Sequence, residues 1–152
     1  MRLSGSDGQS LTLSIVGYQF PELTVAPYDS NWLRVEIDVS HPRGHWSASD
    51  PSLLTHEAAR LADWLESVGA GAAEDAEESF IEPNLLFRVV EAPSGSVLRV
   101  FFGLELRPHW AESDVANSGD VFVEFPLRDL DLQQAARELR EQLRRHPQRA
   151  AV

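Results

Sequence analysis

The sequence predicts an α+β domain: a mainly antiparallel β-sheet of about six or seven strands, with two amphipathic helices packed against it. Segments rich in β-branched and aromatic residues recur along the chain, and two longer segments have the apolar spacing of a helix. Two pairs of successive strands are joined by connections of hairpin length, which favours antiparallel pairing over βαβ crossovers. The chain has 152 residues, of which 43% are hydrophobic, so it is large enough for one domain with one core.

The N-terminal third predicts a strand, a loop and a β-hairpin. Residues 11–20 have strand composition, whereas two prolines place residues 21–30 in a loop. Residues 31–40 alternate strictly, with apolar side chains at odd positions from Leu33 to Val39 and charged ones at even positions between them. This alternation predicts a strand with one face on the core and one in water, followed by a turn and a short return strand over 45–49.

Residues 54–68 change to helical spacing. Thr55 is the expected N-cap, Glu57 suits the first turn, and Gly69 is expected to end the helix. The predicted buried stripe of this helix consists of Ala58, Leu61, Trp64, Leu65 and Val68. Residues 69–79 are small and acidic, which predicts a flexible loop.

The C-terminal half predicts three strands, over 84–92, 96–106 and 120–127, and one helix over 131–146. The first two strands are joined by a Pro-Ser-Gly turn, and a long loop covers 107–119. In the helix, Asp131 is the expected N-cap and Glu141 can pair with Arg145. Its predicted buried stripe consists of Leu132, Ala135, Ala136, Leu139 and Leu143. We expect residues 1–147 to form the domain and 148–152 to form a flexible C-terminal tail.

The charge of the chain restricts its partners. Thirteen basic residues, all arginine, stand against 24 acidic ones and give a net charge of −11. Such a chain should be repelled by nucleic acid and by anionic membranes, so cationic proteins are its favoured partners. The first ten residues lack a secretory signal, and no apolar segment approaches the roughly 20 residues of a membrane helix. We therefore expect a cytoplasmic protein that does not bind membranes.

Catalytic motifs are scarce. The absence of cysteine excludes disulfides and thiolate chemistry, and the absence of lysine excludes Schiff bases and Walker-type sites. His41, His45 and His56, with Glu57, could in principle ligate a metal, but such positions are usually solvent-facing. Glu36 and Asp38 share a strand face about 7 Å apart, which suits either acid–base chemistry or a solvated surface.

Two features indicate where a protein partner could bind. Seven acidic residues and no basic one lie between Arg60 and Arg88, forming either a solubilising loop or an anionic surface that attracts a basic partner. Trp64 belongs to a helical stripe and should be buried, whereas Trp46 and Trp110 near turns fit either a buried or a contact role. The candidate partner-binding residues are Trp32, Glu36, Asp38, Glu74, Asp75, Glu77 and Glu78.

An ordered series of segments resembles the WapI family of immunity proteins. The resemblance covers roughly residues 1–147 and rests on GYQFPE (17–22), DSNWLRVEIDVSHPRGHW (29–46), DPSLLTHEAARLADWLE (50–66), FIEPNLLF (80–87) and FPLRDLDLQQAARELREQLRRHP (125–147). Members of this family are small bacterial cytosolic proteins that protect against contact-dependent toxins.

The resemblance implies a non-enzymatic protein, without a cofactor, that neutralises a toxin domain, often a nuclease. A nuclease must be cationic to hold a phosphate backbone, so an anionic inhibitor is suited to covering that surface. Two alternatives remain open from the residues alone. One is a small metal-dependent hydrolase that uses His41, His45 and His56, and the other is an interaction module without a toxin partner.

Overall fold

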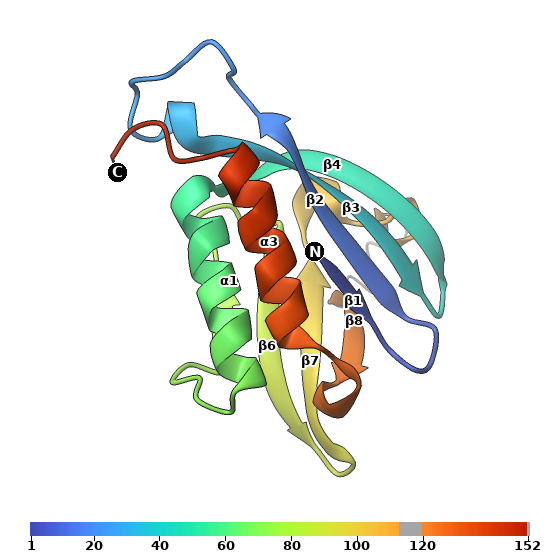
Figure 1. The fold of residues 1–152 in the computed structure, drawn as a ribbon. Helices are drawn as coiled ribbons and strands as arrows, with labels where there is room; N and C mark the ends of the chain where they lie inside the picture. Colours follow the sequence, from blue (N-terminus) through green and yellow to red (C-terminus); the bar gives the residue numbers. More distant parts are fainter. Residues whose placement is uncertain (113–119, 152) are drawn as a thin grey trace.

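The protein has two antiparallel sheets and two long helices (Figure 1). The computed structural model describes residues 1–112 and 120–151. Within these residues each sheet has four strands, in the orders β1-β2-β3-β4 and β5-β6-β7-β8. The predicted α+β class is therefore confirmed, with eight strands in place of the expected six or seven.

The first sheet is formed by β1 (Arg2–Ser4), β2 (Ser10–Tyr18), β3 (Trp32–His41) and β4 (Gly44–Leu54). The alternation predicted for β3 is confirmed. Every odd-numbered side chain from Leu33 to Val39 is fully buried, while Arg34, Glu36 and Asp38 are exposed. This sheet therefore has one face on the core and one face in solvent.

β4 is longer than the return strand predicted over 45–49. Asp50 and Pro51 resemble a turn in sequence, yet β4 continues through them to Leu54. The register with β3 shifts here, because Leu33 pairs with Leu53 while the next residue, Arg34, pairs with Pro51. This bulge places an extra residue on β4 and lets the strand accommodate a proline.

The two long helices, α1 (Thr55–Gly69) and α3 (Leu132–Arg145), lie side by side (Figure 1). α1 contacts β4, and α3 contacts β1 and β2. Gly69 is the last residue of α1, and Asp131 caps α3 by accepting a 2.8 Å hydrogen bond from the backbone N–H of Gln134, so both of these predictions are confirmed. In the described residues no helix is long and apolar enough to cross a membrane.

The predicted N-cap of α1 is wrong. β4 runs directly into the helix, so Leu54 occupies the cap position and Thr55 is already helical. The buried Glu57 carboxylate accepts a 2.9 Å hydrogen bond from the N–H of Leu54 and thereby satisfies this end of the helix. The Thr55 hydroxyl instead donates to Asn31 Oδ1 at 3.1 Å.

The second sheet is formed by β5 (Glu77–Ser79), β6 (Leu85–Ala92), β7 (Gly95–Phe102) and β8 (Val121–Pro126). The loop predicted over 69–79 therefore contains a short strand, β5. The strand predicted over 96–106 ends at Phe102 and is followed by a 3-10 helix, η2 (Leu104–Leu106). The loop predicted over 107–119 begins with a short helix, α2 (His109–Glu112), and its residues 113–119 lie outside the described part of the chain.

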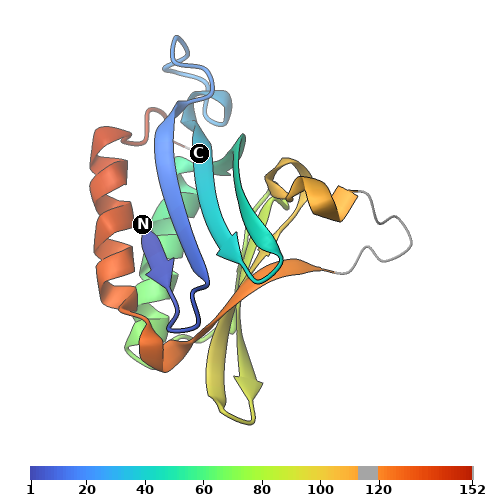
Figure 2. The same cartoon turned by 90° about the vertical axis from the view of Figure 1, so that its right-hand side faces the viewer.

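The two sheets and both long helices share one hydrophobic core. Figure 2 shows the arrangement of these sheets and helices in a second view. Trp46 of β4 joins the sheets, since its ring meets Phe102 edge-to-face at 5.2 Å and its Nε1–H donates to the Leu106 carbonyl at 3.0 Å. Trp64 of α1 is buried beside Phe87 of β6, as its helical spacing predicts. Two further 3-10 turns are η1 (Asp29–Asn31) and η3 (Leu127–Asp129).

Candidate functional site

The solvent face of β2, β3 and β4 is the first candidate surface, and we call it the outer face of the first sheet. Two cross-strand rows define it, Thr12–Asp38–Ser47 and Ser14–Glu36–Ser49. Each row places one carboxylate between two small hydroxyl side chains, and both carboxylates are exposed. The outer face is therefore a polar surface on which β3 places two exposed carboxylates, Glu36 and Asp38, next to the exposed Arg34.

Asp38 is held in its ionised form by its neighbours. His45 Nε2 lies 3.0 Å from Asp38 Oδ1, and the Ser47 hydroxyl donates to Asp38 Oδ2 at 2.9 Å. These hydrogen bonds, first from His45 and then from Ser47, lower the pKa of Asp38 below its ordinary value. Its carboxylate therefore remains charged under conditions where an isolated aspartate begins to take up protons.

The acidic segment that follows α1 is less open than its sequence predicts. Glu78 lies on the core side of β5 and is only 8% exposed, and its carboxylate accepts a 2.5 Å hydrogen bond from Arg60 Nε. Glu77 faces solvent but pairs with Arg88 at 2.6 Å. Glu74 and Asp75 are exposed. Glu78, proposed from sequence as a contact residue, is thus corrected to a buried ion-paired residue, because the segment forms a strand.

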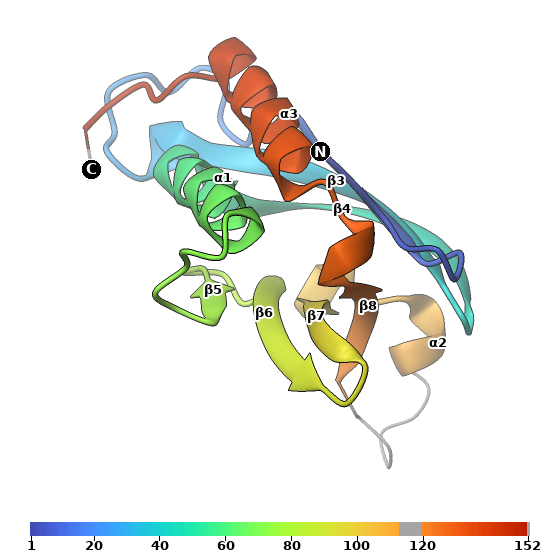
Figure 3. The same ribbon diagram turned by 60° about the horizontal axis from the view of Figure 1, so that its bottom comes forward.

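The seven sequence-predicted contact residues do not form one surface. Glu36 and Asp38 lie on the first sheet, whereas Glu74 and Asp75 precede β5 in the second (Figure 3). Trp32 is half-buried at the start of β3, roughly 13 Å along the strand from Glu36 at ~3.3 Å per residue. Any partner contact predicted from the sequence must therefore be divided between two separate acidic regions.

The three histidines considered as metal ligands are separated. His41 and His45 flank the hairpin turn between β3 and β4, while His56 lies in the first turn of α1. His45 and His56 are at opposite ends of β4, roughly 30 Å apart along the strand at ~3.3 Å per residue. The described residues contain no group of three His, Asp or Glu side chains placed to hold a metal ion. The three-histidine hydrolase hypothesis is therefore wrong in its geometry.

The hairpin instead carries an aromatic cluster. Trp110 packs against Trp46 at 5.9 Å and against His41 at 5.4 Å, and the Arg43 guanidinium lies 4.3 Å from the Trp110 ring centroid. Burial lowers the pKa of His41 below its ordinary value. Trp46 and Trp110, ambiguous from sequence, thus serve to pack the hairpin onto α2 and the second sheet.

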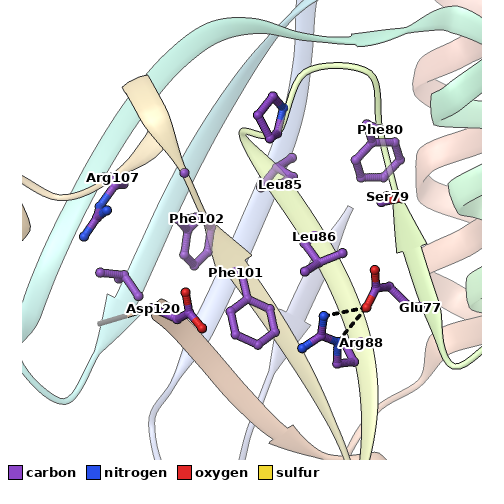
Figure 4. Close-up of a pocket in the computed structure, with 13 residues that line it drawn as sticks. Glu77, Ser79, Phe80, Leu85, Leu86, Arg88, Phe101, Phe102, Arg107 and Asp120 are labelled. Carbon is purple, nitrogen blue, oxygen red and sulfur yellow. Dashed lines mark hydrogen bonds and ion pairs between the residues drawn. The ribbon is translucent and has the colours of Figure 1, made fainter. Parts of the chain in front are cut away.

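A groove of about 470 Å³ lies on the solvent side of the second sheet (Figure 4). Arg107 lies at one end and Arg88 at the other, with Phe101 between them. Arg88 stacks 5.3 Å from the Phe101 ring and Arg107 Nε is buried without a hydrogen-bond partner among the described residues. The groove is not predictable from local sequence, because its lining comes from segments that are separate in the chain. The only available signal was the shared strand face of neighbouring residues such as Leu86 and Arg88.

A further acidic group lies where the two sheets meet. Asp50 of β4 and Glu105 of η2 both accept long hydrogen bonds from the amide of the buried Asn84, at 3.4 and 3.3 Å. Burial first, and then repulsion from Glu105 and Glu82, raises the pKa of Asp50 above its ordinary value. Negative charge is therefore concentrated where the two sheets meet, and it lowers the stability of the folded state there.

These surfaces define a small acidic α+β protein whose open faces are suited to contacts with other proteins. A profile of the WapI-like immunity protein family matches residues 2–147, and the chain belongs to this family. Membership supports an immunity function, implies a toxin as partner, and suggests a role without catalysis. No curated protein matches this sequence.

Proposed function

We propose that this protein neutralises one cationic toxin domain, of the nuclease type, by binding it stoichiometrically and covering the basic surface with which it holds nucleic acid. It acts in the cytoplasm, requires no cofactor and catalyses no reaction. Neutralisation by coverage needs a stable complementary surface and no reactive group.

The observation that carries this proposal is membership of the immunity family over residues 2–147. The charge of −11 supports a cationic partner, because opposite net charges accelerate association and favour this partner over nucleic acid. The outer face of the first sheet supports the same partner, since its carboxylates, Glu36 and Asp38, stand exposed among short hydroxyl side chains that leave them accessible.

The proposal is tested with the purified protein and a candidate toxin domain taken from the product of the neighbouring gene. Calorimetry at low salt and at about 0.5 M salt should give one-to-one binding that weakens as screening increases. Nucleic-acid cleavage by the toxin domain should fall in proportion to the fraction bound. Absence of binding at low salt, where charge attraction is strongest, would overturn the proposal.

A further inference from the structure

The connection between β2 and β3, residues 19–31, is a closed loop, which we call the β2–β3 loop. A 2.9 Å hydrogen bond from the N–H of Gln19 to the Trp32 carbonyl closes its base. Within the loop, the N–H of Ser30 donates to Ala26 at 3.1 Å and that of Asn31 donates to Tyr28 at 2.9 Å. Compact loops whose ends meet in this way frequently carry function.

Asn31 connects the base of the loop to two other parts of the protein. Its side chain is fully buried, and its Oδ1 accepts from the Thr55 hydroxyl at 3.1 Å and from the N–H of Arg149 at 2.9 Å. Its Nδ2 donates to the carbonyls of Pro27 at 2.6 Å and Ala150 at 2.8 Å. One amide therefore joins the β2–β3 loop to the start of α1 and to the segment after α3.

Arg149 braces the other side of the loop. Its Nη1 donates to the carbonyls of Phe20, Pro21 and Leu23, at 3.1, 3.0 and 2.7 Å. Its guanidinium also lies 3.5 Å from the ring centroid of Tyr18. Figures 1 and 2 both show the segment after α3 running beside this loop, which projects beyond the first sheet. The main chain of the loop is thus held from both sides.

The loop nevertheless leaves its large apolar side chains in solvent. Val25 is 85% exposed, Tyr28 54% and Leu23 37%. Neighbouring apolar residues exposed together often mark contact surfaces, and tyrosine is a frequent anchor residue. An anchor already fixed in its bound shape loses little conformational entropy on binding. A loop whose main chain is held in place and whose apolar side chains are exposed has the arrangement expected of such an anchor.

Acidic side chains flank these apolar residues. Glu22 and Asp29 are both exposed, and the positive charge of Arg149 is directed at the carbonyls of the loop. We propose that the β2–β3 loop inserts Tyr28 and Val25 into an apolar recess of a cationic toxin domain, with Glu22 and Asp29 meeting basic residues at its rim. This inference rests on the proposed function and names the contact element.

The binding test uses the toxin domain described above as the probe. Val25→Asp and Tyr28→Ala are compared with Ile81→Ser, which alters a side chain that is 59% exposed on a different loop. We expect each loop variant to weaken the Kd at least tenfold, as loss of an interface anchor does. Ile81→Ser should bind as the unaltered protein does. Circular dichroism melting establishes that every variant is folded.

The possible outcomes separate the two proposals. If the unaltered protein does not bind the toxin domain, the proposed function fails and this inference fails with it. If the unaltered protein binds and both folded loop variants bind equally well, the proposed function stands and the anchor role of the loop is overturned.

The brace is tested without any partner. In Arg149→Gln, hydrogen exchange at the loop amides of Ser30 and Asn31 should accelerate at least tenfold, because the carbonyls and the Tyr18 stack lose their support. Amides of β3 paired with β2 should exchange as before. Unchanged exchange in the loop would overturn the bracing role of Arg149, and with it the claim that the anchor is pre-organised.

Discussion

At the residue scale, Gly103 occupies a position that is closed to any side chain. A Cβ placed on it would lie 2.3 Å from the carbonyl oxygen of Pro83, and its own N–H donates to the Asn84 carbonyl at 2.9 Å. Glycine is required here because two backbone segments approach closely. The backbone angle does not require it, since φ at this residue is an ordinary −118°. The end of β7 and the segment before β6 can therefore meet only at a glycine.

We predict that Gly103→Ala destabilises the protein by about 1–3 kcal/mol, the usual cost of forcing extra atoms into a packed site. Denaturant unfolding measures the difference. Ser49→Ala, on the exposed outer face of the first sheet, is the control and should change the free energy of unfolding by less than about 0.5 kcal/mol. Equal stability of the two variants would contradict the close approach.

Asp50 gives a prediction with an unusual dependence on pH. Its pKa is raised in the folded state, so its ionised form costs stability at neutral pH, and this cost is relieved as the pH falls through the folded pKa. Asp50→Asn should therefore increase the free energy of unfolding at pH 7 by about 0.5 kcal/mol, the scale of a partly exposed charge pair.

The gain from Asp50→Asn should shrink as the pH falls below the folded pKa, because the native aspartate is then neutral as well. Thermal melting of both proteins between neutral and acidic pH measures this convergence. A gain that stays constant across the range would show that the effect has no electrostatic origin.

At the element scale, Glu57 joins α1 to the connection between β5 and β6. Glu57 is 1% exposed, and its carboxylate accepts hydrogen bonds from the N–H groups of Leu54, at 2.9 Å, and Ile81, at 2.8 Å. One carboxylate therefore accepts a backbone hydrogen bond at the start of α1 and another in the segment that joins β5 to β6.

We predict that Glu57→Ala costs about 2–4 kcal/mol, since it leaves two N–H groups without an acceptor. Glu57→Gln keeps one oxygen for one of these groups and should cost roughly half as much. Chemical denaturation of the three proteins measures the order. The account fails if Glu57→Gln is as damaging as Glu57→Ala.

Elements with a clear period were predictable from sequence, and contacts between distant segments were not. The alternation in β3 and the stripe of α3 each follow from local spacing, so their buried faces were predicted correctly, except that Leu143 at the end of the stripe is only partly buried. The acidic residues of β5 have low strand propensity and predict a loop, whereas in the structure Arg60 neutralises the buried Glu78 and the strand forms. The groove of Figure 4 and the brace on the β2–β3 loop depend on long-range contacts that no local pattern encodes.

At the scale of the whole molecule, exposed carboxylates form one region on each sheet, in addition to Asp50 and Glu105 where the sheets meet. Glu36 and Asp38 lie on the first, and Glu74 and Asp75 precede the second. Both contribute to long-range attraction of a cationic partner, but only a region inside the interface also affects dissociation. Two paired charge reversals can therefore distinguish the regions.

We predict that Glu36→Lys with Asp38→Lys leaves the stability within about 0.5 kcal/mol and slows association with the toxin domain by about tenfold at low salt. The matched control, Glu74→Lys with Asp75→Lys, makes the same change in net charge elsewhere. Stopped-flow association at two salt concentrations compares them. Unchanged association of the first variant at low salt would exclude steering by the outer face.

The hydrogen bonds between Arg149 and the β2–β3 loop span up to 129 positions in the sequence, and Arg2 reaches Glu138 across 136. During translation, the loop and β1 must therefore wait for residues made much later before they can dock. Such distant pairings slow folding, because the intervening chain must first be drawn together. In a newly made chain, β1 therefore docks against α3, and the β2–β3 loop is braced by Arg149, only after α3 and the residues beyond it have left the ribosome.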